Sequence, residues 1–274
     1  MLKFIHLSDL HIHGSNKKED NVNTVKIVDF IIERYDNLEK KPVIIVTGDI
    51  TDDGKKNQYK NAVNILRHLT NSGFKILACP GNHDYGPAGN LYTEKSQRLF
   101  QEFILADLLN NETAYDESVT MEDLYPINET LSDVLFIGLD SVVGNEEELL
   151  HFASGEVGKP QREKLYNILV NQENLDKKTV IYFHHHPFYR NIIKRLVLEM
   201  DDAKQVMGIL ANRVHFVCFG HKHLSESWMA EYGIDWILAS GKTAERNDMY
   251  KFHFREVTID GDNSIVSMIT FKKD

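Results

Sequence analysis

The chain has 274 residues, two cysteines and a net charge of −10 at neutral pH. With 42% hydrophobic and 26% charged residues, its composition is that of a folded globular protein that does not need disulfides, not of a disordered chain. The acidic balance disfavours long nucleic acids and anionic lipid as partners, and no apolar run approaches the ~20 residues of a membrane helix. The apolar run at the N-terminus is too short for a signal peptide, so we expect a cytoplasmic protein.

Strand and helix patterns alternate in the first third of the chain. Apolar runs at residues 3–7, 42–47 and 74–78 predict strands, and helical periodicity predicts helices at residues 22–35 and 57–69. This alternation implies parallel strands covered by helices. Sites in such sheets lie just beyond the carboxyl ends of the strands. Asp9, Asp49 and Asn82 each follow a predicted strand.

The remainder of the chain is less regular. Helices are predicted at residues 94–109, 160–170 and 202–211, and strands at residues 134–139, 179–183 and 214–219. Residues 110–128 show no clear period, and the acidic run at residues 146–148 is typical of a solvated loop. Strands at residues 250–259 and 265–271 flank Asp260-Gly261-Asp262-Asn263, which indicates an antiparallel hairpin. We expect a single α/β domain over residues 1–274 with two stacked mixed sheets and outer helices, including a hairpin at about residues 250–271.

Five short polar motifs follow apolar runs. Each supplies Asp, Asn or His, and such oxygen and imidazole ligands suit divalent first-row metals. Taken singly, each is most often a turn or a helix cap. Their joint occurrence at equivalent places relative to a strand instead indicates a two-metal site. The motifs are Asp9-Leu10-His11, Gly48-Asp49, Gly81-Asn82-His83-Asp84, His184-His185-His186-Pro187 and Gly220-His221-Lys222-His223.

The spacing suggests how these residues could act. Alternation out of a strand would turn Asp9 and His11 to one side, and would likewise turn both histidines of Gly-His-Lys-His to the site and Lys222 away. Asp49 has two oxygens with which to bridge two ions. Metals ~3.5–4 Å apart can clamp a phosphate and lower the pKa of a bridging water. His83 could then protonate the leaving group, with Asp84 orienting its ring.

These motifs resemble the pattern of the calcineurin-like metallophosphoesterase superfamily, which runs Asp-x-His, Gly-Asp, Gly-Asn-His-Asp/Glu, His and Gly-His-x-His. The resemblance implies a four-layer α/β/β/α sandwich and two divalent metal ions drawn from Mn, Fe, Zn, Co and Ni. It also implies that His83 is catalytic. The ligand expected from the triple histidine is His185, because the family ligand usually stands two residues before a proline, here Pro187; His184 or His186 could substitute. The implied ligands are Asp9, His11 and His223 for one metal and Asn82, His185 and His221 for the other, with Asp49 bridging.

Finer features are similar to the class III cyclic nucleotide phosphodiesterase branch. They are residues 48–54 (Gly-Asp-Ile-Thr-Asp-Asp-Gly), Leu139-Asp140-Ser141 and His185-His186-Pro187. The resemblance implies a binuclear-metal phosphodiesterase that hydrolyses cyclic nucleotides or similar small phosphodiesters by attack of a metal-bridging hydroxide. The alternatives are a phosphomonoesterase or nucleotide pyrophosphohydrolase and, less favoured, a nuclease or a non-catalytic scaffold. The expected partner is a small-molecule phosphoester, not a membrane or a nucleic acid polymer, and the sequence leaves the oligomeric state open.

Overall fold

Two mixed β-sheets form the centre of the fold. The computed structural model describes residues 1–14, 21–89, 92–116, 118–142, 154–188, 199–243 and 252–271. The acidic run at residues 146–148 lies outside them. One sheet has the strand order β11-β10-β1-β2-β3 and the other β4-β5-β6-β7-β9-β8. The strands of the first sheet are β1 (Leu2–Leu7), β2 (Val43–Thr47), β3 (Ile76–Cys79), β10 (Phe252–Asp260) and β11 (Asn263–Phe271). Those of the second are β4 (Ile127–Leu131), β5 (Val134–Gly138), β6 (Lys178–Tyr182), β7 (Phe216–Phe219), β8 (Glu226–Glu231) and β9 (Ile234–Ala239).

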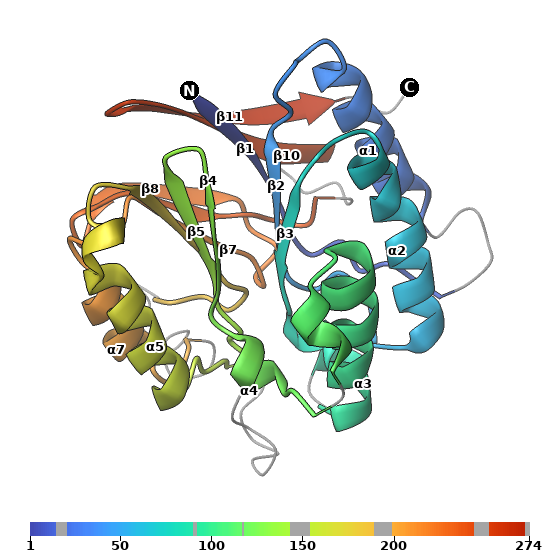
Figure 1. Ribbon diagram of the computed structural model, residues 1–274. Coiled ribbons are helices and arrows are strands. Elements are labelled where there is room, and N and C mark those ends of the chain that lie inside the picture. The colour runs from blue at the N-terminus through green and yellow to red at the C-terminus, as the bar shows by residue number, and fades with distance from the viewer. Residues whose placement is uncertain are drawn as a thin grey trace.

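Helices cover the outer faces of both sheets, as Figure 1 shows. On the first sheet lie α1 (Val22–Tyr35) and α2 (Lys56–Asn71), and on the second lie α5 (Lys159–Val170) and α7 (Ala203–Leu210). The segment between β3 and β4 holds α3 (Glu94–Leu99), the π-helix η3 (Phe100–Leu108) and α4 (Met121–Leu124). Short 3-10 turns are η1 (Asn82–Asp84), η2 (Pro87–Gly89), η4 (Glu112–Tyr115) and η5 (Gln172–Asn174). None of the helices in the described ranges is long and apolar enough to span a bilayer.

Side chains from both sheets share one buried core. Phe4 of β1 packs edge-on against Phe136 of β5 and Phe216 of β7, with ring centroids 6.1 and 5.8 Å apart. A second buried cluster lies between the other face of the larger sheet and its helices, and includes Ile181 and Phe183. These contacts produce the layer order helix, sheet, sheet, helix and confirm the predicted four-layer sandwich.

Strand direction agrees with the sequence patterns in the interior of both sheets. β1, β2 and β3 are parallel, as are β5, β6, β7 and β9, whereas β10 and β11 pair antiparallel. The sequence missed β4 and the pair β8 and β9. β8 has no buried residue, so its sequence lacks the apolar alternation that marks a half-buried strand.

Candidate metal centre

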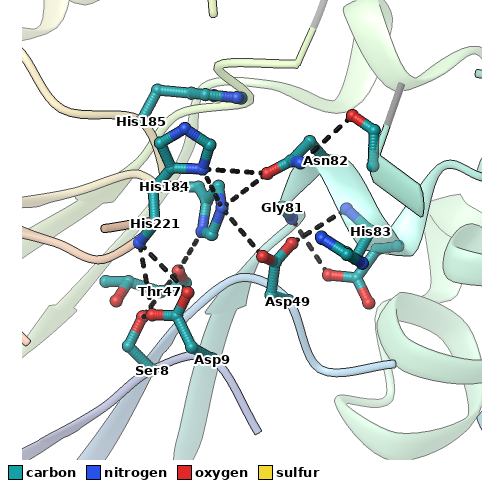
Figure 2. Close-up of polar contacts among 12 residues, drawn as sticks. Ser8, Asp9, Thr47, Asp49, Gly81, Asn82, His83, His184, His185 and His221 are labelled. Atoms are coloured by element: carbon teal, nitrogen blue, oxygen red, sulfur yellow. Dashed lines mark hydrogen bonds and ion pairs between the residues drawn. The ribbon is translucent and has the colours of Figure 1, made fainter. Parts of the chain in front are cut away.

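The five motifs meet where the parallel strands of both sheets end. Asp9 and Asp49 stand two residues beyond β1 and β2, and His184 and His221 stand two residues beyond β6 and β7. Asn82 follows β3 and begins the turn η1. Because the two sheets face each other, their strand ends bring residues far apart in the sequence into one group (Figure 2).

The backbone of this group adopts an uncommon conformation. Asp9, His11, Asp49, His221 and His223 all have positive φ, with values between 43° and 73°. Non-glycine residues rarely occupy this left-handed region, and where they do the surrounding structure must hold them there. Such concentrated strain is typical of functional sites, where it directs side chains to a shared point.

Glycines beside these residues let the loops approach closely. A Cβ on Gly81 would lie 2.3 Å from the backbone nitrogen of Asp49. A Cβ on Gly220 would lie 1.8 Å from Ser8 Oγ and 2.5 Å from Asp9 Oδ2. The glycines of Gly-Asn-His-Asp and Gly-His-Lys-His are therefore needed for space between neighbouring loops.

One group of possible ligands consists of Asp9, His11, Asp49 and His223. Their ligand atoms all lie within 4.8 Å of one another. His223 Nε2 is 3.3 Å from Asp9 Oδ1 and 3.3 Å from His11 Nε2. His11 Nε2 is in turn 3.7 Å from Asp49 Oδ2. The structure thus brings together all four residues that the sequence assigned to this half of the site.

A second group consists of Asp49, His184 and His221, with Asn82 beside them. His184 Nε2 lies 3.3 Å from Asp49 Oδ2 and 2.9 Å from Asn82 Oδ1. His221 Nδ1 lies 3.0 Å from the same Asn82 oxygen. The Asn82 amide nitrogen donates to the Gly89 carbonyl at 3.1 Å, which keeps the amide oxygen turned to the histidines. Asp49 belongs to both groups, as a bridging carboxylate would.

The hydrogen bonds of His184 show that this group suits a cation. His184 Nδ1 lies 2.7 Å from the Thr47 carbonyl oxygen, which can only accept, so Nδ1 carries the proton. In the neutral ring, Nε2 then has a lone pair facing the oxygens of Asp49 and Asn82, which are acceptors too. Acceptors this close need a shared proton or a metal ion between them. The side chains therefore fit a divalent metal.

The close approach of carboxylates and imidazoles also shifts the pKa values of the buried histidines. Burial opposes the charged form of His184, but the carboxylates of Asp49 and Asp9 outweigh it and raise the pKa of His184 to about 9. Burial and the neighbouring His185 and His184 hold the pKa of His221 well below its usual value. Despite burial, His184 keeps the pKa of Asp49 well below the usual range. Without metal, a proton on His184 thus occupies the place that a cation would take.

The structure brings His184, not the expected His185, to the second group. Val180 and Tyr182 belong to the core between the sheets, whereas Ile181 and Phe183 face the helices. Alternation along the strand therefore continues to His184 on the inner side.

His185 has different partners. Its Nδ1 lies 2.9 Å from Ser141 Oγ, and its Nε2 is buried without a hydrogen-bond partner. Its ring lies 4.6 Å from that of His221 between centroids, but Figure 2 draws no hydrogen bond from it to the other residues shown. The reason is geometric. Alternation along the strand decides which histidine points to the inner side of the sheet, and the number of residues before Pro187 does not.

His83 stands at the edge of the group, and Asp52 holds its ring instead of Asp84, the residue that the sequence suggested. Its backbone nitrogen donates to Asp49 Oδ1 at 2.9 Å, and its ring Nδ1 donates to the Asp52 carbonyl oxygen at 2.7 Å. The Asp52 carboxylate also lies 3.4 Å from His11 Nδ1 and 3.3 Å from His13 Nδ1. Asp52 therefore holds His11 and His83 in place. The acidic residues that follow Gly-Asp were the available sequence signal.

The sequence suggested that Asp84 orients the ring of His83, but the structure shows a different role. Its fully buried carboxylate accepts hydrogen bonds from the backbone nitrogens of Ile50, Thr51 and Gly81 and from the Thr51 hydroxyl, at 2.8–3.2 Å. These bonds join the loop after β2 to the loop after β3. Asp84 thus fixes the spacing between Asp49 and Asn82.

Lys222 also differs from the sequence expectation. It does not point away from the group, because its Nζ lies 2.8 Å from His221 Nε2. Burial lowers the pKa of Lys222 to about 8, against the opposite effect of Asp9 and Asp49. A second residue without a predicted role, Ser8, donates to Asp9 Oδ2 at 2.5 Å.

Comparison with known proteins is consistent with this arrangement. The family described as calcineurin-like phosphoesterase matches residues 2–225. A probable cyclic nucleotide phosphodiesterase of Xenorhabdus bovienii (strain SS-2004) is 26% identical over 234 residues, which cover 83% of this chain and 81% of the relative. A probable glycerophosphodiester phosphodiesterase of Arcobacter nitrofigilis is 27% identical over 231 residues, which cover 80% of this chain and 71% of the relative. The crystal structure of a dimetal phosphatase from Danio rerio superposes with a TM-score of 0.69 at 15% identity and covers 99% of both chains.

Proposed function

The chain belongs to the calcineurin-like phosphoesterase family, and from this premise we propose that it hydrolyses small phosphodiesters, cyclic nucleotides among them. It is a metal-dependent phosphoester hydrolase whose side chains suit two divalent metals. The observation that carries the proposal is the convergence of acceptor atoms around Asp49. These acceptors outnumber the protons that hydrogen bonds could place between them.

The proposed ligand assignment divides these residues into two sets that share Asp49. Asp9, His11 and His223 hold one metal, and Asn82, His184 and His221 hold the other. The distances of the candidate groups support this division, and strand alternation supports His184 over His185. Asp, Asn and His together suit Mn, Fe, Zn, Co or Ni, and metal availability selects among them.

The protein residues around the metals position the substrate and move one proton. Two bound divalent metals would polarise the phosphoryl group and make a water molecule nucleophilic near neutral pH. His83 donates a proton to the leaving oxygen from Nε2, because its Nδ1 is already bonded to the Asp52 carbonyl. Asp49 accepts the His83 backbone N–H and so keeps this histidine beside the metal ligands.

A diester substrate is supported by two of the relatives that match most of the chain. Both are named as phosphodiesterases, one for cyclic nucleotides and one for glycerophosphodiesters, and each match covers at least 80% of this chain. The Danio rerio protein, which shares the fold, is named as a dimetal phosphatase. Monoester hydrolysis is therefore the outcome that a test has to separate from diester hydrolysis.

The separating experiment compares two aryl phosphates. Protein stripped with EDTA and restored with Mn²⁺ is assayed with bis(p-nitrophenyl) phosphate, with p-nitrophenyl phosphate and with a panel of 3′,5′-cyclic nucleotides. We expect a larger kcat/KM for the diester than for the monoester, turnover of at least one cyclic nucleotide, and loss of all activity in Asp49→Asn. Faster turnover of the monoester would overturn the diester proposal, and activity that survives EDTA or Asp49→Asn would overturn the metal centre.

The single-domain organisation over residues 1–274 and the cytoplasmic location stay predictions from the sequence. Limited proteolysis checks the first, because one domain resists cleavage except near its surface loops. Fractionation of the source cells checks the second.

A further inference from the structure

Lys222 contacts His221, a proposed metal ligand, at ring nitrogen Nε2. It lies between His221 and His223 in Gly-His-Lys-His, and its backbone nitrogen donates to the Gly220 carbonyl at 2.9 Å. This tight turn, together with the positive φ of His221 and His223, folds the half-buried lysine side chain onto the site. Its Nζ reaches within 2.8 Å of His221 Nε2.

The two ring nitrogens of His221 have different surroundings. Nδ1 faces the ligand group, 3.0 Å from Asn82 Oδ1 and 3.2 Å from His184 Nε2. Nε2 faces Lys222. An ammonium group can only donate hydrogen bonds, so Nε2 must accept and the ring proton sits on Nδ1, from which it donates to Asn82.

Metal binding reverses this arrangement. A metal held by Nδ1 leaves the ring proton on Nε2, which then becomes a donor. Two donors, Nε2–H and the lysine ammonium, cannot form a hydrogen bond with each other. The contact between Lys222 and His221 is therefore compatible with the metal-free site and incompatible with the loaded one.

We propose that Lys222 is a phosphate-binding residue that leaves His221 when the second metal binds and then donates to a non-bridging oxygen of the substrate phosphoryl group. This rests on the proposed two-metal site. The lysine lies beside the ligand group, and its flexible four-carbon side chain can move away from His221 by changing its torsions. A mobile ammonium suits phosphate because it acts as a point charge with three donors and needs no fixed orientation.

The first test measures phosphate binding without turnover. Inorganic phosphate is titrated calorimetrically into Mn²⁺-loaded wild type, Lys222→Met and Lys26→Met, an exposed lysine of α1 that serves as the matched control. Losing a charge-assisted hydrogen bond should weaken phosphate binding by about tenfold to a hundredfold in Lys222→Met, with Mn²⁺ content unchanged. Lys26→Met should bind phosphate as the wild type does. Phosphate affinity within twofold of wild type in Lys222→Met would overturn the proposal.

The second test needs no variant and so survives a folding defect in Lys222→Met. Wild-type protein is pulsed with acetic anhydride in the metal-free, Mn²⁺-loaded, and Mn²⁺- and phosphate-loaded states, and acetylation of each lysine is read by peptide mass spectrometry. Normalised to Lys26, acetylation of Lys222 should rise several-fold with Mn²⁺ and fall again with phosphate. Acetylation that neither Mn²⁺ nor phosphate changes would contradict the proposal. A protein that binds Mn²⁺ and phosphate but hydrolyses no phosphoester would instead contradict the proposed function alone.

Discussion

Replacing Asp84 with asparagine should destabilise the protein even when no metal is present. One carboxylate oxygen accepts from the Thr51 nitrogen and hydroxyl, and the other accepts from the nitrogens of Ile50 and Gly81. An amide keeps one of these oxygens and turns an NH₂ donor toward either the nitrogens of Ile50 and Gly81 or the nitrogen and hydroxyl of Thr51, of which only the hydroxyl can accept. At about 1.5–3 kcal/mol for each bond to a charged acceptor, losing one or two bonds costs about 1.5–6 kcal/mol.

The assay is urea unfolding followed by circular dichroism in EDTA. Asp84→Asn is compared with wild type and with Asp29→Asn, which changes an exposed carboxylate of α1 and should stay within about 0.5 kcal/mol of wild type. If Asp84→Asn lost activity but kept the wild-type free energy of unfolding, Asp84 would act on catalysis directly. That result would refute the structural role that its four hydrogen bonds imply.

Three further substitutions test separate parts of the site, and a fourth, in α7, serves as a control. His83→Ala should lower kcat by about 10²–10⁴ with Mn²⁺ content unchanged, and the loss should be smaller for a p-nitrophenolate leaving group, which needs little protonation; an equal loss for every leaving group would argue against proton donation. Asp52→Ala should weaken Mn²⁺ binding by about 10–100-fold, because its carboxylate lies 3.4 Å from His11 Nδ1, and calorimetry showing wild-type affinity would speak against that role. Gly81→Ala should abolish Mn²⁺ binding, because its Cβ would lie 2.3 Å from the backbone nitrogen of Asp49. Gly208→Ala, in α7 with nothing within 4 Å, should instead raise the free energy of unfolding by about 0.5–1 kcal/mol. Tight Mn²⁺ binding by Gly81→Ala would contradict the packing argument.

The sequence predicted the architecture and the meeting of distant motifs for one physical reason. Parallel strands that end at the same edge carry the residues after them to one place, so Asp9, Asp49 and Asn82 could be grouped from strand patterns alone. His221 and His223 joined them through the same rule in the second sheet. Buried central strands give strong apolar signals, and the site depends on these strands.

Strand alternation contained a signal that distance to a proline did not. Pro187 follows the strand in a loop, and sheet geometry does not fix how many residues separate a loop proline from the inner face. Counting in steps of two from Val180 and Tyr182 leads directly to His184. A residue count from the strand therefore supports His184 over His185 as the proposed ligand.

Side-chain partners across loops lay beyond the sequence. The bonds of Asp84 to Gly81 and Thr51, and of Lys222 to His221, depend on how separate loops pack in three dimensions. Nothing in the local pattern distinguishes an aspartate that orients a histidine from one that ties two loops together. The exposed strand β8 escaped prediction for a related reason, because its residues pack on one neighbour only and carry no core pattern.

The most direct measurement is anomalous diffraction from crystals of the Mn²⁺-loaded protein. Two peaks should lie on either side of the Asp49 carboxylate, one touching Asp9, His11 and His223 and the other touching Asn82, His184 and His221. A single peak, a second peak bound to His185 in place of His184, or a carboxylate at position 49 that touches neither ion would contradict the proposed two-metal centre.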